Sequence, residues 1–171
     1  RMYVYGQFDT AYDTAKTFDN KTGFVCFPEN EKGDTVITMK VSTSFISADQ
    51  AKHNMALEVP GDATFESVYK QAQKIWDDQL GIIELEGADP YELETFYSSM
   101  YRLFAYPNSY HENTGTNENP VWKHANPASS DVAKPEVMDG TLYVNNGFWD
   151  TYRTTWPAYA FFTPEKAGDM L

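Results

Sequence analysis

A carboxylate, an aromatic ring and a guanidinium lie close together near the end of the sequence, at Asp150, Trp149 and Arg153. A carboxylate accepts hydrogen bonds from two neighbouring sugar hydroxyls, and an indole ring packs against the apolar face of a sugar. The three residue types therefore suit carbohydrate recognition. If the turn is helical, positions three apart are also surface neighbours, and Asp150 with Arg153 would form an ordinary ion pair. Spacing alone favours neither interpretation.

Other residues with chemical potential give weaker signals. His111 and Glu112 are adjacent and both can ligate a metal ion, but no second histidine follows at helical spacing, which favours a solvated pair in a loop. The remaining candidates are expected to be structural or solvated: Asp77-Asp78 on the polar side of a helix, and the lone histidines His53 and His124.

Composition narrows the function classes. The 171 residues carry a net charge of −12, which argues against nucleic acid because phosphate binding needs clustered Lys and Arg. No stretch approaches the ~18 apolar residues of a membrane-spanning helix. Aromatic residues make up 16% of the chain, and such rings stack on sugars but also fill the cores of β-sandwiches. The single cysteine, Cys26, cannot form an internal disulfide and is expected to be a small buried hydrophobe.

The first third of the sequence predicts β-structure. Runs rich in β-branched and aromatic residues indicate strands over residues 2–9, 23–28 and 34–44, with turns at 20–23 and 29–33. Strands at this spacing favour an antiparallel sandwich. Three strands cannot complete a sandwich, so we expect further strands before the first residue.

The middle of the sequence predicts helices. Ser47 with Gln50 forms a capping-box pattern before a helix that reaches about Leu57, and a second helix starts near Thr64 and reaches Gly81. Residues 82–87 read as a short strand. Asp89, Pro90 and Glu92 then mark a strong helix start, and Pro107 ends that helix.

The last third begins with a break in the pattern. Residues 105–145 are rich in Asn, Pro, Gly and Ser and predict a long loop, of a length that is uncommon unless the loop is functional or disordered. A helical region is expected from Asn146, with Pro157 starting or kinking its helix. Thr163-Pro164 is expected to cap a further helix.

Four blocks of the sequence together resemble the α-mannosidases of glycoside hydrolase family 92. The segment Phe148-Trp149-Asp150-Thr151-Tyr152-Arg153-Thr154, followed by Trp156-Pro157 and Thr163-Pro164-Glu165, is similar to the family's WDTYR…P…PE stretch. The other three blocks precede it in the family's order: Thr43-Ser44-Phe45-Ile46-Ser47 with Ala51-Lys52-His53-Asn54-Met55 and Glu58; Trp76 with Leu80; and Phe96-Tyr97-Ser98-Ser99-Met100-Tyr101-Arg102 with Pro107-Asn108.

The resemblance implies a fold of β followed by α. In the family an N-terminal antiparallel β-sandwich is followed by a helical linker and an (α/α)6 barrel. Residues 1–46 would be the C-terminal part of the sandwich, residues 47–89 the linker with a short strand, and residues 90–171 the incomplete beginning of the catalytic domain.

The resemblance also implies an activity. The family's enzymes are exo-acting and inverting, depend on Ca²⁺, and remove terminal α-mannose from glycans, including N-glycans. Their acid, base and calcium ligands lie downstream of this sequence, so no catalytic residue and no metal ligand is assigned within it. Asp150 carries over as a residue that binds the terminal mannose, Trp149 as a wall of that subsite, and Arg153 as a partner that orients Asp150.

The same resemblance implies partners and a location. The rest of the same polypeptide is expected to complete the fold, and a secreted, periplasmic or cell-surface location in a bacterium is expected. The sequence departs from the family at Trp156, where a His is common, and residues 107–147 match only at Asp139-Gly140, which leaves the linkage and sugar preference undetermined.

Two other function classes fit part of the pattern. A non-catalytic carbohydrate-binding or adhesion module would explain the aromatic content equally well. Another (α/α)6 glycoside hydrolase, similar to trehalase or glucoamylase, would share the helical part, but the segment from Ser44 to Glu58 argues against it.

Overall fold

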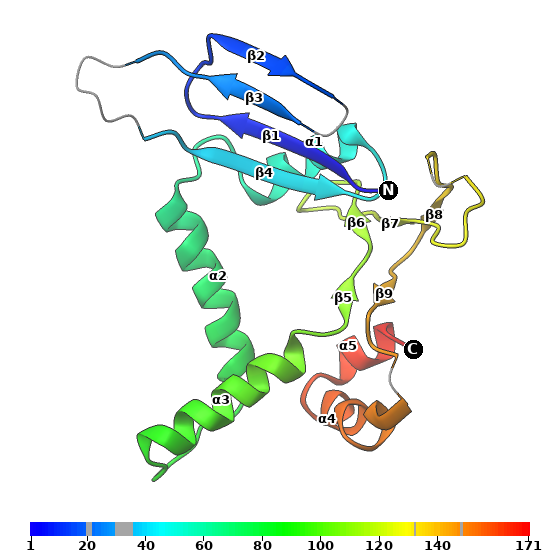
Figure 1. The fold of residues 1–171 in the computed structure, drawn as a ribbon. Helices are drawn as coiled ribbons and strands as arrows, with labels where there is room; N and C mark the ends of the chain where they lie inside the picture. The colour runs from blue at the N-terminus through cyan, green and yellow to red at the C-terminus, as the bar shows by residue number, and fades with distance from the viewer. Residues whose placement is uncertain (20–21, 30–35, 132, 148) are drawn as a thin grey trace.

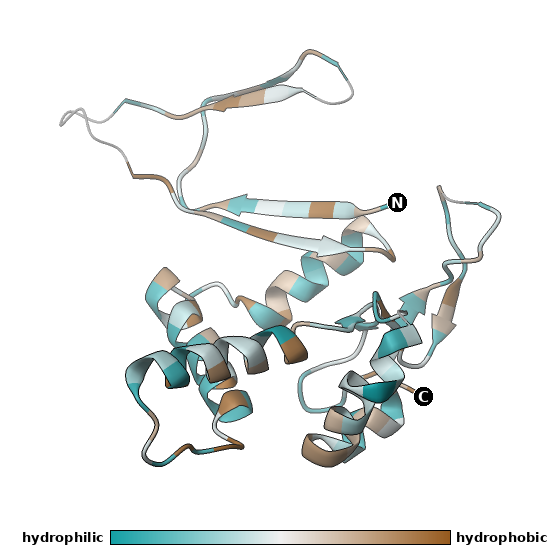
Figure 2. Cartoon of the chain, turned by 60° about the horizontal axis from the view of Figure 1, so that its bottom comes forward, coloured by the Kyte–Doolittle hydropathy of each residue, from teal (hydrophilic) through white to brown (hydrophobic). Residues whose placement is uncertain are grey.

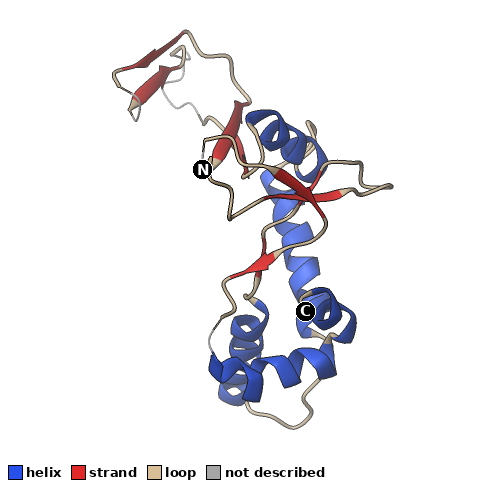
Figure 3. Ribbon diagram, turned by 90° about the vertical axis from the view of Figure 1, so that its right-hand side faces the viewer, coloured by secondary structure: helices blue, strands red, loops and turns tan. Residues whose placement is uncertain are grey.

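A computed structural model describes residues 1–19, 22–29, 36–131, 133–147 and 149–171. The N-terminal strands and helix α1 lie together, and α2 leads away from them to α3 (Figure 1). The chain then returns through short strands beside the first layer and ends in α4 and α5. Strands therefore gather towards one end of the described chain and most helices towards the other (Figure 3).

Two strand pairs make up the N-terminal region. β1 (Tyr3–Phe8) pairs antiparallel with β4 (Met39–Ser44), and β2 (Thr14–Thr17) pairs antiparallel with β3 (Gly23–Cys26). The strands expected at 2–9 and 23–28 are confirmed, while β2 was missed. The third expected strand starts at residue 39, later than predicted; its first two residues, and the turns at 20–21 and 30–33, lie outside the described residues. The described strands form these separate pairs and do not complete a sandwich.

The β2–β3 hairpin has no second layer over it among the described residues. All of its strand residues are exposed, and Phe18 packs only loosely on Phe24, with ring centroids 5.5 Å apart. Cys26 at the end of β3 is exposed, so the expectation of a buried cysteine was wrong. Burial of Cys26 would require a layer that this part of the chain does not supply.

Local hydrogen bonds explain where the helices begin. α1 (Ala48–Glu58) starts at Ser47, whose hydroxyl accepts the backbone N–H of Gln50 at 3.0 Å. The other half of the expected capping box is absent, because the Gln50 side chain turns inward. α2 (Phe65–Leu80) and α3 (Pro90–Phe104) start with complete capping boxes, Thr64 with Ser67 and Asp89 with Glu92. These starts confirm the predictions made from cap residues.

The connection between α2 and α3 corrects one prediction. Residues 82–87 form turns and bends rather than the expected short strand. Among the residues that the structure describes, no strand pairs with them, and the Ile83 carbonyl instead accepts a hydrogen bond from the hydroxyl of Tyr97 at 2.9 Å. Gly87 has a φ of 75°, a left-handed conformation that suits glycine and ends any extended run.

The stretch expected to be a long loop contains short strands. β5 (Asn108–Ser109) pairs with β9 (Tyr143–Val144), and β7 (Trp122–Ala125) pairs with both β6 (Glu112–Asn113) and β8 (Val137–Asp139). The β5–β9 pair brings residues more than 30 positions apart side by side, and the Tyr110 N–H extends this pairing by donating to the Leu142 carbonyl at 2.8 Å.

The C-terminal region is helical, as expected. A 3₁₀ turn, η1 (Trp149–Arg153), precedes α4 (Thr155–Phe162), and Pro157 lies in the first turn of α4, where a proline is tolerated. α5 (Pro164–Asp169) follows Thr163, whose hydroxyl bonds the Tyr159 carbonyl rather than capping α5. These helices alone do not form a barrel, so the (α/α)6 assignment stays a prediction.

Few apolar side chains are buried in the described chain. Hydrophobic residues, brown in Figure 2, occur along both strands and helices, and many large ones stay exposed, including Phe65, Ile75 and Phe161. The buried apolar residues are Ala51, Met55, Met100, Ala125, Tyr159 and Ala167. Side-chain hydrogen bonds therefore contribute much to holding the strands and helices in place relative to one another. None of the described helices is long and apolar enough to span a membrane.

The cap of α3 gives a stability prediction. Asp89→Ala removes the carboxylate that accepts Glu92 N–H at 2.9 Å, and we expect the free energy of unfolding to fall by about 1 kcal/mol in urea titrations. Glu94→Ala, on the exposed face of the same helix, is the control and should change the free energy by less than about 0.5 kcal/mol. Equal losses for the two variants would contradict the assigned cap.

Candidate functional site

The predicted sugar-binding residues lie on the exposed turn η1. Trp149 is 73% exposed, and Asp150 and Arg153 are exposed as well. Arg153 places its guanidinium 5.1 Å from the centre of the Tyr152 ring, and its Nε donates to the Tyr152 hydroxyl. Within the described residues, Asp150 forms no salt bridge. The ion pair between Asp150 and Arg153 is thus absent, because the guanidinium is engaged with the neighbouring ring.

A cavity of about 310 Å³ borders the segment that leads into this turn. Tyr143 and the residues up to Gly147 line one side of it, and Pro107, Trp156 and Met170 line the other. Asn145 turns the chain with a φ of 67°, which asparagine tolerates better than most residues. The buried Nδ2 of Asn146 has no hydrogen-bond partner within the described residues. No local sequence pattern marks Asn146, because the burial of its side chain depends on residues distant in the sequence that line the same cavity.

His111 fixes the strand that precedes the turn. Its Nδ1 accepts a hydrogen bond from the backbone N–H of Leu142 at 3.2 Å. Its ring packs in a T-shaped arrangement against Trp122 and against Tyr143, with ring centroids 5.1 and 5.0 Å apart. The expectation that His111 and Glu112 form a solvated loop pair was therefore wrong, because both side chains are held by distant parts of the chain.

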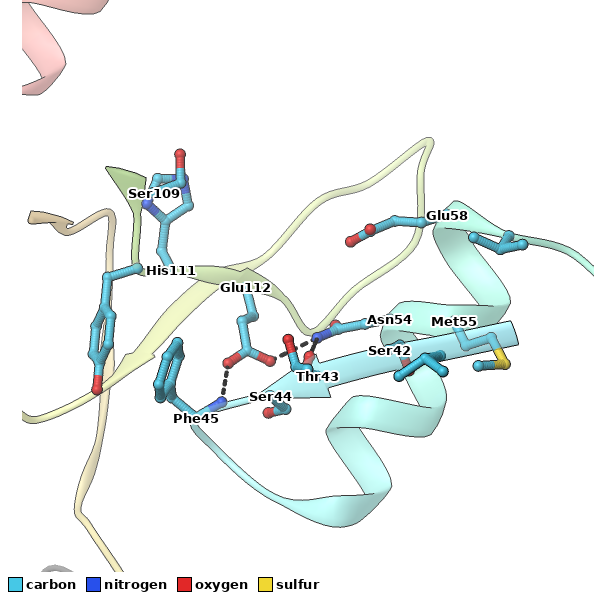
Figure 4. Close-up of a pocket in the computed structure, with 13 residues that line it drawn as sticks. Ser42, Thr43, Ser44, Phe45, Asn54, Met55, Glu58, Ser109, His111 and Glu112 are labelled. Atoms are coloured by element: carbon cyan, nitrogen blue, oxygen red, sulfur yellow. Dashed lines mark hydrogen bonds between the residues drawn. The ribbon is translucent and has the colours of Figure 1, made fainter. Parts of the chain in front are cut away.

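Glu112 lines a second cavity, also about 310 Å³, between β4, α1 and the β5–β6 segment (Figure 4). Its carboxylate oxygens accept Phe45 N–H at 2.7 Å and the Asn54 amide at 2.8 Å. The Gln50 amide donates both to Asn54 and to the Asn113 carbonyl, each at 2.8 Å. This network is largely buried and joins three elements. The partners lie too far away in the sequence for a local pattern to reveal them.

Glu58 faces the same cavity (Figure 4). Burial and, to a smaller extent, the negative charge of Glu112 raise the pKa of the Glu58 carboxyl above its ordinary value. The side chain keeps contact with solvent, which moderates this repulsion. The carboxylate pair nevertheless leaves this end of α1 electrostatically unfavourable at neutral pH.

The remaining candidates are structural. Asp78 pairs with Lys74 at 2.7 Å on the exposed face of α2, which confirms the solvated helix face. His53 Nε2 lies 2.7 Å from the Gly115 carbonyl and His124 Nδ1 lies 3.0 Å from the Gly140 carbonyl, so both histidines fix backbone. Within the described residues, no three His, Cys, Asp or Glu side chains gather to hold a metal ion.

The turn η1 thus presents an exposed indole and, next to it, a carboxylate that forms no salt bridge among the described residues. Comparison with known proteins identifies the family of the chain. Residues 50–171 match the model of the glycosyl hydrolase family 92 catalytic domain. The chain therefore belongs to glycosyl hydrolase family 92.

Individual relatives agree with this assignment. An uncharacterized secreted glycosidase of Arthroderma benhamiae is 34% identical over 107 residues, which are 61% of this chain and 13% of the relative. A family 92 inverting mannosidase of Bacteroides thetaiotaomicron superposes with a TM-score of 0.79 at 28% identity, over 99% of this chain and 23% of that structure. A family 92 α-mannosidase of the same organism has a TM-score of 0.72 at 22% identity, over 98% and 24%, and shows the shared fold. The chain thus spans less than a quarter of the length of the fungal relative and of each bacterial structure.

The raised pKa of Glu58 predicts how the stability of the folded chain changes with pH. The folded state binds the Glu58 proton more tightly than the unfolded state, so stability falls as pH rises from the ordinary glutamate pKa through the raised one. Glu58→Gln removes this loss and should melt above the wild type at pH 7. The difference should vanish below the ordinary glutamate pKa.

Thermal melts from acid to neutral pH measure this difference. Glu94→Gln, on the exposed face of α3, controls for the general gain from removing one negative charge from an acidic chain. A Glu58→Gln melting temperature equal to that of Glu94→Gln at every pH would show that neither burial nor the charge of Glu112 raises the pKa of Glu58.

Proposed function

We propose that the polypeptide containing this chain is an α-mannosidase that removes terminal α-mannose from glycans by hydrolysis. The observation that carries the proposal is the η1 turn, which presents together an exposed indole and a carboxylate without a salt bridge in the described part of the chain, in a member of glycosyl hydrolase family 92. The similarity to an inverting mannosidase at 28% identity supports mannose as the sugar and inversion as the outcome.

The binding step follows from the side chains of the turn. Asp150 accepts hydrogen bonds from two adjacent hydroxyls of the terminal mannose, and Trp149 packs against an apolar face of the ring. Because the subsite binds the terminal mannose in this way, the enzyme is proposed to act on chain ends and so to be exo-acting. Arg153 acts on Tyr152 and shapes the edge of the subsite, since its guanidinium lies against that ring.

The bond-breaking groups are proposed to lie elsewhere in the polypeptide. An inverting glycosidase uses one carboxylic acid on the leaving oxygen and one carboxylate on a water, on opposite faces of the sugar. Calcium is proposed to bind mannose hydroxyls with ligands outside this chain. Secretion is part of the proposal because the fungal relative is named as a secreted glycosidase; a bacterial source remains a prediction.

Asp150→Asn in the full-length polypeptide tests the assignment. The amide keeps the size of the side chain but can accept only through one oxygen, so we expect kcat/KM on an aryl α-mannoside to fall at least about 100-fold. Asp169→Asn, exposed near the end of α5, is the matched control and should stay within about twofold of the wild type.

This activity assay, together with measurements of product configuration, chelation and mannose binding, separates the other possibilities. Retention of activity in Asp150→Asn would remove Asp150 from the mannose subsite. An active wild type whose first product is the anomer of retained configuration by NMR would refute inversion, and full activity after exhaustive chelation would refute calcium dependence. Mannose binding without any hydrolysis would favour a carbohydrate-binding module.

A further inference from the structure

One buried tyrosine connects the helix that follows the η1 turn to the rest of the described chain. Tyr159 on α4 is 1% exposed. Its hydroxyl donates to the Leu103 carbonyl at 2.7 Å and also contacts the Tyr106 carbonyl. Its ring packs against Phe104 and Trp156, with centroids 6.2 and 5.8 Å away. The contact therefore joins α4 to the C-terminal end of α3.

The acceptors explain why a tyrosine suits this position. Leu103 lies in the last turn of α3, where backbone carbonyls have no partner within the helix. A phenol has one proton, which these two carbonyl oxygens share. Burial raises the pKa of the Tyr159 phenol, so the group stays protonated and remains a donor. Phenylalanine would fill the same space and leave the carbonyls without this donor.

Other contacts of this region hold it less firmly to the preceding helices. α4 packs mainly against its chain neighbours η1 and α5. A hydrogen bond from Lys166 to Gln79 also reaches α2, but it measures 3.3 Å and is exposed. The position of η1 relative to α3 thus depends strongly on Tyr159.

We propose that Tyr159 is a positioning residue for the mannose subsite: its hydroxyl fixes α4 on the end of α3 and so sets where Trp149 and Asp150 meet the sugar. This inference rests on the proposed function of the turn. It assigns Tyr159 no contact with substrate, because the side chain is enclosed between two helices.

The test compares Tyr159→Phe with Tyr97→Phe. Tyr97 lies on α3, and its hydroxyl donates to the backbone carbonyl of Ile83 at 2.9 Å. Tyr97→Phe therefore also loses a hydrogen bond from a tyrosine hydroxyl to a backbone carbonyl, but this bond does not involve η1 or α4. In the full-length polypeptide, hydrogen exchange followed by mass spectrometry should show faster exchange over residues 149–160 in Tyr159→Phe only. In the full-length polypeptide, the inhibition constant of mannose should rise roughly tenfold in Tyr159→Phe and stay within twofold in Tyr97→Phe.

A rescue separates positioning from loss of stability. Placing p-aminophenylalanine at position 159 restores a donor, and should restore both slow exchange over 149–160 and mannose affinity; it also serves if Tyr159→Phe does not fold. Equal exchange over 149–160 in the two Phe variants, or faster exchange with unchanged mannose affinity, would overturn the proposal. A wild type that binds no mannose would refute the proposed function, while the exchange data would still decide whether Tyr159 anchors the turn.

Discussion

The carboxylate of Glu112 is the constraint on which the arrangement of the described elements depends most. It accepts a hydrogen bond from the Phe45 backbone N–H at the end of β4 and another from the Asn54 side-chain amide on α1, 58 residues away in the sequence. Asn54 and Gln50 are only 8% and 9% exposed, and an unpaired polar group at such a position costs about 1–3 kcal/mol. Strand, helix and the β6 segment are therefore stable together rather than separately, in a chain with few buried apolar residues.

This network also limits where the turn η1, the proposed sugar-binding turn, can lie. Next to Glu112, His111 accepts the Leu142 backbone N–H and packs on Tyr143, which places β9 just before the turn. After the turn, Tyr159 bonds the end of α3. The backbone of η1 is thus held on both sides, while Trp149 and Asp150 stay exposed. Recognition of a soluble ligand benefits from this division, because fixed flanks limit the ordering needed on binding.

Local signals in the sequence predicted the helices well and the pairing of distant segments poorly. Thr64 and Asp89 correctly predicted the starts of α2 and α3, because a helix cap is a hydrogen bond between residues only a few positions apart. The strand predicted over residues 82–87 was wrong, because an apolar run does not indicate whether a partner strand is present. The two-residue strands β5 and β9 are too short to show a period. His111 and Glu112 were misjudged as solvated because their partners come from β4, α1 and the segment before β9.

The geometry changes the role of one predicted site residue. Arg153 was expected to orient Asp150, but its guanidinium lies over Tyr152 and donates to that hydroxyl. An ion pair would have occupied a carboxylate oxygen and would have to be broken before a sugar hydroxyl could bind. Among the described residues, Arg153 instead engages Tyr152. Under the proposed function, this contact of the cation with the aromatic ring leaves the neighbouring carboxylate available to a sugar hydroxyl rather than holding it in place.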